Sequence, residues 1–154
     1  MRPPPFQVFL EEHREPVYRF LRAMVGPDEA EDAFQETFLS ALRGYRRLRD
    51  GSNLRAWVMT IAYRKAVDAR RGRKRRPHPM GEVPDRPGAG NPEPPDEEVW
   101  RRIRDLPAAQ RTAVFLRHAG DLAYREVARV MGTSESAARQ SVRLGLRRLR
   151  EEWR

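Results

Sequence analysis

Residues 122–150, LAYREVARVMGTSESAARQSVRLGLRRLR, predict two helices joined by a tight turn. An apolar helical repeat covers residues 124–131, and Gly132 follows at the place where a helix needs a residue that tolerates the left-handed conformation. Ser134 stands where the next helix needs an N-terminal cap. The apolar stripes that can face one another in this hairpin are Val127 and Val130 with Ala138, Val142, Gly145 and Leu149. The pattern is that of a helix-turn-helix.

The second helix of this hairpin is strongly basic, and its charge has two interpretations. Helical hairpins with glycine in the turn are common, and an arginine-rich face is often only solvated. The alternative is that the helix lies in the major groove of DNA, with a cap and an outward stripe at Ser134, Ser136, Arg139, Gln140 and Arg143. Arg139, in the first turns, is then expected to read a base, whereas Arg143 and Arg147 contact phosphates.

The composition of the whole chain favours a polyanionic partner. The 154 residues include 31 lysines and arginines and 22 acidic residues, for a net charge of +9. Only Lys65 and Lys74 are lysines, so nearly all the positive charge is arginine. This preference for arginine has two explanations: bidentate contacts to phosphate and guanine, or a GC-rich genome. Cysteine is absent, and His13, His78 and His118 lack ligand spacing, so we expect no metal and no other cofactor.

A change of composition divides the chain into two helical blocks. Residues 76–95, RPHPMGEVPDRPGAGNPEPP, are dense in proline and glycine and predict a flexible linker. Strand patterns are almost absent, so we expect an all-α fold with small domains at residues 1–75 and 96–154. No segment has the length and apolarity of a membrane span or a signal peptide, so a cytoplasmic protein without membrane insertion is expected.

Turn signals separate the helices expected within each block. Gly26 and Pro27 end the first apolar pattern, and Asp28 or a neighbour is expected to cap the second helix. The apolar stripe of that second helix is predicted at Ala30, Phe34, Phe38 or Thr37, Ala41 and Leu42. A turn at residues 50–53 precedes a third helix with the stripe Leu54, Trp57, Val58, Ile61, Ala62 and Lys65. In the second block, residues 109–118 are expected to form a single helix.

Three segments carry a resemblance to a known family. EDAFQETFLSALRGYRRL (31–48) and NLRAWVMTIAYRKAVDARRGRKRR (53–76) resemble the second region of bacterial sigma factors of the extracytoplasmic-function (ECF) class. Residues 106–151 resemble their fourth region. The resemblance implies two all-α domains on a tether and a promoter-recognition subunit without catalytic chemistry. The implied partners are core RNA polymerase and promoter DNA.

The resemblance also implies roles for particular residues. An acidic-polar helix docks on a coiled coil of the polymerase, and one helix face carries Asp32, Gln35, Glu36 and Leu39. The alternative for Asp32 and Glu36 is pairing with nearby arginines such as Arg43. The following loop and basic helix open and hold the −10 element, for which we expect Ser52 and Asn53 to bind an extruded base while Arg55, Arg64, Lys65 and Arg71 track phosphates. Trp57 is expected to be mainly a core residue, and the helix-turn-helix reads the −35 element.

The chain departs from the family pattern at three positions. Ala56 replaces the usual Thr or Ser beside the tryptophan, and Ser141 and Leu144 occupy positions that are commonly Arg. Phosphate anchoring at −35 is therefore expected to weaken, or to move to the arginines nearby. Because the chain ends at Arg154, we expect any regulation to come from a separate protein such as an anti-sigma factor.

Two other classes of function compete with this interpretation. A dimeric operator-binding regulator would use the helix-turn-helix without docking on core polymerase. Such a regulator would give no reason for the sequence patterns at residues 31–48 and 53–76. A dimer would also need a long apolar helix face for self-association, and the sequence has none. An enzyme is not expected, because the carboxylates lie on arginine-rich helices and no nucleophile–base pair or glycine-rich phosphate loop occurs.

Overall fold

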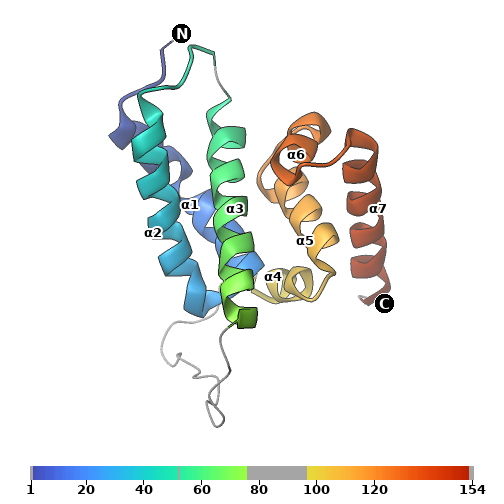
Figure 1. The fold of residues 1–154 in the computed structure, drawn as a ribbon. Helices are drawn as coiled ribbons and strands as arrows, with labels where there is room; N and C mark the ends of the chain where they lie inside the picture. The colour runs from blue at the N-terminus through green and yellow to red at the C-terminus, as the bar shows by residue number, and fades with distance from the viewer. Residues whose placement is uncertain (1, 52, 76–96, 153–154) are drawn as a thin grey trace.

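The computed structural model describes residues 2–51, 53–75 and 97–152, and all regular structure in these ranges is helical. The expectation of an all-α fold is therefore confirmed, while the expected linker at 76–95 lies outside the described residues. The helices of the first half lie together on one side of the molecule, and those of the second half lie on the other (Figure 1). In chain order the elements are α1 (Phe6–Val25), α2 (Pro27–Tyr45), α3 (Leu54–Arg75), α4 (Glu97–Arg104), α5 (Ala108–Val114), the π-helical turn η1 (Phe115–Ala119), α6 (Tyr124–Met131) and α7 (Glu135–Glu152).

The junction between α1 and α2 is a Gly-Pro corner. Gly26 has a positive φ of 86° and ends α1, and Pro27 begins α2, where its fixed φ suits a helix and its missing N–H costs nothing. The expected cap at Asp28 or a neighbour falls on Gly26, without a side-chain hydrogen bond. Asp28 and Glu29 instead lie in the first turn of α2, where carboxylates interact favourably with the helix dipole.

The core of the first half forms where α1, α2 and α3 meet. Phe9, Leu21 and Met59 are fully buried there, and the Trp57 ring lies at the edge, 5.8 Å from the ring of Phe9 between centroids. One member of the predicted stripe of α2 is wrong: Leu42 is 52% exposed. Leu42 lies one helical turn after the buried Phe38, so helical spacing from a core residue is not enough to bury it.

The predicted helix-turn-helix is present in α6 and α7. Gly132 adopts φ 68° and ψ 36°, the left-handed conformation that ends α6. The Ser134 hydroxyl accepts a hydrogen bond from the backbone N–H of Ala137 at 3.0 Å and so caps α7. The expected single helix at 109–118 is wrong, because α5 begins at Ala108 and widens into η1. There the N–H of Gly120 bonds to the carbonyl of Phe115, five residues back.

The two halves pack directly on one another, with α1 against α4, α5 and η1, and α3 against α6. The rings of Phe20 and Phe115 meet edge-on at 5.5 Å between centroids, and both are buried. Arg111 donates a hydrogen bond of 3.1 Å to the carbonyl oxygen of Met24. The buried apolar cluster is therefore continuous from one half into the other. None of the described helices has the length and apolar character to cross a membrane.

Candidate nucleic-acid interface

The outer face of α7 presents the residues expected to contact DNA. Ala138, Val142 and Leu149 are buried on the inner side, so the helical period turns the opposite stripe outward. α7 stands at the outer edge of the molecule, beyond α5 and α6 (Figure 1). The exposed residues of this surface, which we call the α7 stripe, are Ser134, Ser136, Arg139, Gln140, Arg143 and Arg147. The predicted exposure of all six is observed.

Two arginines of the α7 stripe contact neighbouring side chains on α7, and one of them also contacts α6. Arg139 forms an ion pair with Glu135 at 2.8 Å, and its guanidinium lies 4.5 Å from the centroid of the Tyr124 ring. Arg143 donates a 3.1 Å hydrogen bond to the side-chain oxygen of Gln140. The cationic groups near the start of α7 therefore have defined positions.

Asn53, expected to capture an unpaired base, makes two contacts in this structure. Its side-chain oxygen accepts a 3.0 Å hydrogen bond from the N–H of Ala56 and so caps α3. Its amide nitrogen donates to the carboxylate of Glu126 on α6. The sequence spacing gave no sign of this second contact. Ser52, predicted to act beside it, lies outside the described residues.

The basic residues predicted to hold the −10 backbone do not all share a face of α3. Arg64 and Arg71 are seven positions apart, so both point to the same side, and both are exposed. Arg55 lies nine positions from Arg64, half a turn away, and donates at 3.4 Å to the carbonyl of Gly120. Lys65 is half-buried and lies on α3 between the side that carries Arg64 and Arg71 and the side that carries Arg55. The structure thus brings together Arg64 and Arg71, and separates Arg55 from them.

The predicted docking face on α2 is exposed. Asp32, Gln35 and Glu36 are exposed, and Leu39 is 53% exposed beside them. Neither carboxylate of this face forms an ion pair within the described residues, so the alternative pairing with Arg43 is not observed. Leu42, three positions after Leu39, adds a second exposed leucine, although the apolar spacing of α2 predicts it in the core. We refer to Asp32, Gln35, Glu36, Leu39 and Leu42 as the α2 face.

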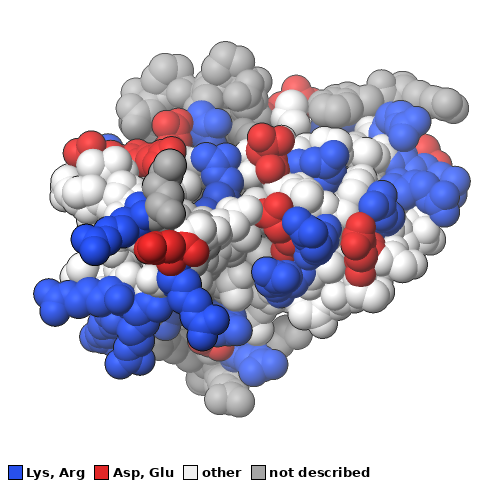
Figure 2. Space-filling view, turned by 90° about the horizontal axis from the view of Figure 1, so that it is seen from above, with Lys and Arg blue, Asp and Glu red and all other residues white. Residues whose placement is uncertain are grey.

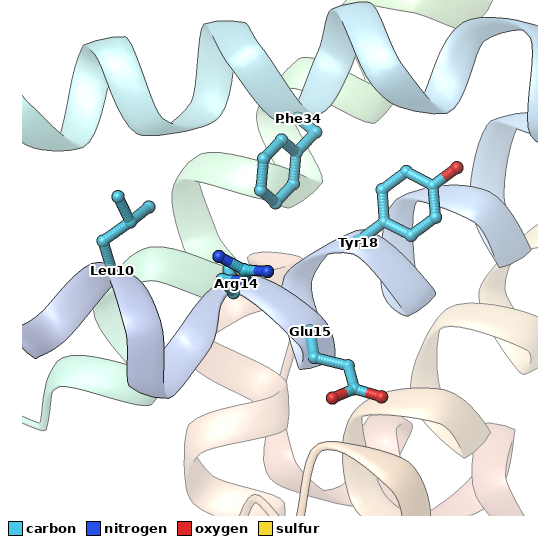
Figure 3. A pocket seen from close by; sticks show the side chains of 5 residues that line it. All are labelled: Leu10, Arg14, Glu15, Tyr18 and Phe34. Carbon is cyan, nitrogen blue, oxygen red and sulfur yellow. The ribbon is translucent and has the colours of Figure 1, made fainter.

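A hollow of about 410 Å³ lies between α1 and α2. Figure 3 shows Phe34 of α2 pointing toward α1, next to Tyr18, and the two rings meet edge-on at 5.8 Å between centroids. Leu10, Arg14 and Glu15 of α1 complete the lining. These side chains offer an apolar floor with one cation and one carboxylate, which is the composition of a seam between two packed helices. No group of three metal-binding side chains occurs in the part of the chain that the structure describes.

Burial shifts the pKa of two basic side chains, the buried His13 and the half-buried Arg111. Burial lowers the pKa of His13, nearby Arg55 lowers it further, and the Glu12 carboxylate partly opposes this shift. Burial and the neighbouring Arg70 lower the pKa of Arg111 to about 10. Arg111 stays charged at neutral pH, so it can bind the Met24 carbonyl at the end of α1, where a helix has unpaired acceptors.

Basic side chains are spread over the face of the molecule that is seen from above. Figure 2 shows this face, with a dense group of Lys and Arg at the lower left, more of them across the right-hand half, and acidic side chains between. Together with the net charge of +9, this distribution suits a polyanion that contacts more than one part of the surface.

Comparison with known proteins gives matches along both halves. Residues 9–76 match the family described as Sigma-70 region 2, and residues 96–149 match Sigma-70, region 4. The sequence is 32% identical over 152 residues to the RNA polymerase sigma factor CarQ of Myxococcus xanthus, covering 95% of this chain and 87% of CarQ. It is 37% identical over 127 residues to the ECF RNA polymerase sigma factor SigG of Mycobacterium tuberculosis, covering 73% of this chain and 33% of SigG.

A solved structure with a similar fold is that of the sigma factor RpoE in complex with the anti-sigma factor NepR from Bartonella quintana. The TM-score is 0.78 at 24% sequence identity, and the alignment covers 95% of this chain and 94% of RpoE. The arrangement of helices is therefore shared over nearly the whole length of both proteins.

Proposed function

Because this chain belongs to the extracytoplasmic-function class of RNA polymerase sigma factors, which direct RNA polymerase to promoters, we propose that its two halves divide promoter recognition between them. Residues 1–75 bind core polymerase and the −10 element, and residues 96–154 bind the −35 element. Residues 76–95 connect them as a tether. The observation that carries this proposal is the α7 stripe, six exposed polar or cationic side chains opposite a buried apolar stripe.

At the −35 element, α7 enters the major groove with the α7 stripe facing the bases. Arg139, near the start of the helix, donates to a base edge, and a guanidinium suits guanine in particular because it presents two parallel donors. Arg143 and Arg147 lie further along and neutralise phosphates. Ser141 and Leu144, where the family commonly has Arg, are half-buried here, so these exposed arginines supply the anchoring.

At the −10 element, the turn before α3 takes up an unpaired base and the exposed side of α3 holds the backbone. Asn53 supplies amide and carbonyl groups of the kind that recognise a base edge, and Arg64 and Arg71 lie on one exposed side of the same helix. Arg55 faces Gly120, so it contacts DNA only after the two halves separate.

Core polymerase binds the α2 face. Two carboxylates and two exposed leucines on one side of a helix suit a partner helix that offers arginines around an apolar strip. The protein works in the cytoplasm with the polymerase, which carries out all the chemistry. Since RpoE is found with the anti-sigma factor NepR, we propose that an anti-sigma factor also regulates this chain.

Transcription in vitro tests the proposal. Purified protein is added to core RNA polymerase with a pool of promoter fragments, and the transcripts are sequenced. We expect starts that depend on the protein and share upstream elements at −10 and −35. If the protein instead bound duplex operators without core enzyme and started no transcripts, the operator-binding regulator would replace this proposal.

A further inference from the structure

Two guanidinium groups contact the ring of Tyr124, the first residue of α6. Arg139 of α7 approaches to 4.5 Å from the ring centroid, and Arg117 of η1 approaches to 4.8 Å. Arg117 also donates a 3.2 Å hydrogen bond to the carbonyl oxygen of Leu122, which ties it to the segment leading into α6. The half-buried Tyr124 ring packs against the apolar core at the same time. It is therefore a fixed platform beneath Arg139.

Arg139 needs such a platform because its other contact is weak. The ion pair with Glu135 joins side chains that are 59% and 47% exposed, and solvent screens a pair of that kind. An arginine with only this partner would sample several rotamers. Contact between the guanidinium and the face of an aromatic ring adds attraction and restricts the orientation of the guanidinium plane.

We propose that Tyr124 is a positioning residue for −35 recognition, which holds the Arg139 guanidinium ready to contact a base. This inference rests on the proposed role of Arg139 as a base reader. A side chain fixed in its binding conformation loses less entropy on binding, so a preorganised Arg139 discriminates more strongly between base pairs. Tyr124 acts through Arg139, and its loss affects the base pair that Arg139 reads.

The test uses full-length protein with core polymerase, on promoter fragments in which each −35 base pair is changed in turn. The variants are Tyr124→Phe, Tyr124→Leu, Arg139→Ala and the double variant Tyr124→Leu/Arg139→Ala. Tyr124→Phe keeps the ring and should retain the preference of the unmodified protein. Tyr124→Leu should reduce the preference at one base pair by about two- to fivefold, the effect expected from an exposed cation–π contact.

Three controls separate positioning from a purely structural role. Tyr124→Leu should leave the salt dependence of binding unchanged, because it removes no phosphate contact. It should have no further effect in the Arg139→Ala background. Glu135→Gln, which loosens Arg139 from the other side without touching the core, should reduce the preference at the same base pair.

The outcomes distinguish this inference from the proposed function on which it rests. If Arg139→Ala relaxes the preference and Tyr124→Leu does not, the inference is wrong and the role of Arg139 stands. If Tyr124→Leu weakens binding to all sequences equally and adds to Arg139→Ala, the ring is only structural and the inference is again wrong. If Arg139→Ala itself leaves every preference intact, the role of Arg139 and the inference are both wrong.

Discussion

The side-chain amide of Asn53, at the start of α3, is hydrogen-bonded to the carboxylate of Glu126 on α6, 73 residues further along the chain. Asn53 is the residue proposed to take up an unpaired base, and Glu126 belongs to the helix-turn-helix. Glu126 occupies one of the two N–H donors of the Asn53 amide, so a base that uses this donor must displace Glu126. In this arrangement of the two halves, the residue proposed to bind the −10 element contacts the helix-turn-helix proposed to bind the −35 element.

Replacing Glu126 by Ala should make Asn53 more accessible to single-stranded DNA. The variant removes one exposed hydrogen bond and one negative charge near the DNA site, so the affinity for a −10 non-template oligonucleotide should rise by about fivefold. Fluorescence anisotropy with the full-length protein measures this. Glu31→Ala, which removes an exposed carboxylate from α2, is the control for charge alone. Equal gains from both variants would show that the Asn53–Glu126 contact has no part in the effect.

Asn53 variants can separate helix capping from base recognition. Asn53→Ala removes the cap of α3 and should cost about 1 kcal/mol of unfolding free energy, whereas Asn53→Ser can keep the cap. Both variants lose the amide, so both should slow opening of duplex promoters and have less effect on a pre-melted template. Permanganate footprinting and thermal unfolding give the two readouts. Normal opening by Asn53→Ser would mean that Asn53 only caps the helix.

Charge reversal on the α2 face should abolish binding to core polymerase. The double variant Asp32→Arg/Glu36→Arg places two cations where we propose that arginines of the partner lie. Leu42→Ser should weaken binding by a smaller amount, and since Leu42 is 52% exposed it should leave the unfolding temperature nearly unchanged. Co-purification with core enzyme and circular dichroism test both. Undiminished co-purification of the double variant would contradict the assignment.

The arginines of the α7 stripe should differ in their effect on DNA binding: Arg139 should determine sequence preference, and Arg147 should determine overall affinity. Arg139→Ala should cost about 1–3 kcal/mol and relax the preference at one −35 base pair. Arg147→Ala should weaken binding to all sequences and lower the salt dependence by about one counterion. Holoenzyme would be titrated against fragments with intact and scrambled −35 elements at several salt concentrations. An equal loss by Arg139→Ala on both fragments would make α7 only a phosphate clamp.

Acid should destabilise the protein through His13. Burial lowers the pKa of this imidazole in the folded state, so below the ordinary value of about 6.5 the unfolded chain takes up a proton that the folded protein resists. The contribution of His13 to stability is complete above about pH 6.5 and falls as the pH drops below it. His13→Leu should reduce this dependence between pH 7 and 5.5, as measured by thermal unfolding. An unchanged dependence in the variant would place its origin at other groups.

Local patterns predicted much of this structure, because the signals for helix ends and helix faces are themselves local. Gly132 and Ser134 mark the turn of the helix-turn-helix by their own conformational and capping properties, and the period of α7 determines which arginines are exposed. Leu42 was misassigned because a stripe defined by spacing does not tell how far the neighbouring helix reaches. The turn η1 was not predicted because the apolar pattern of residues 109–118, which includes the buried Phe115 and Leu116, does not distinguish a π-helical turn from a regular helix.

The contacts between the two halves also lay beyond sequence patterns. The helical period alone places Arg55 half a turn away from Arg64, but it gives no indication that Arg55 contacts Gly120, which lies 65 residues further along the chain. Likewise, the spacing of Asn53 in its turn predicted a polar group at the right place and gave no indication of Glu126. Periodicity reports the face of a helix on which a residue lies, and the partner of that face depends on the tertiary arrangement.

The close contact between α5 and α7 has a consequence for redesigning promoter choice. A Cβ atom at Gly145 would lie 2.6 Å from a methyl group of Val114, a residue with a stiff side chain, so any larger residue would push α7 away from α5 and tilt it. A library aimed at new promoters should therefore randomise Ser136, Arg139, Gln140 and Arg143 and keep Val114 and Gly145 unchanged. With that seam intact, each new set of side chains would enter DNA at the same angle. Differences in promoter choice among library members would then come from the new side chains and not from a changed position of α7. Variants that select different promoters could therefore be compared directly.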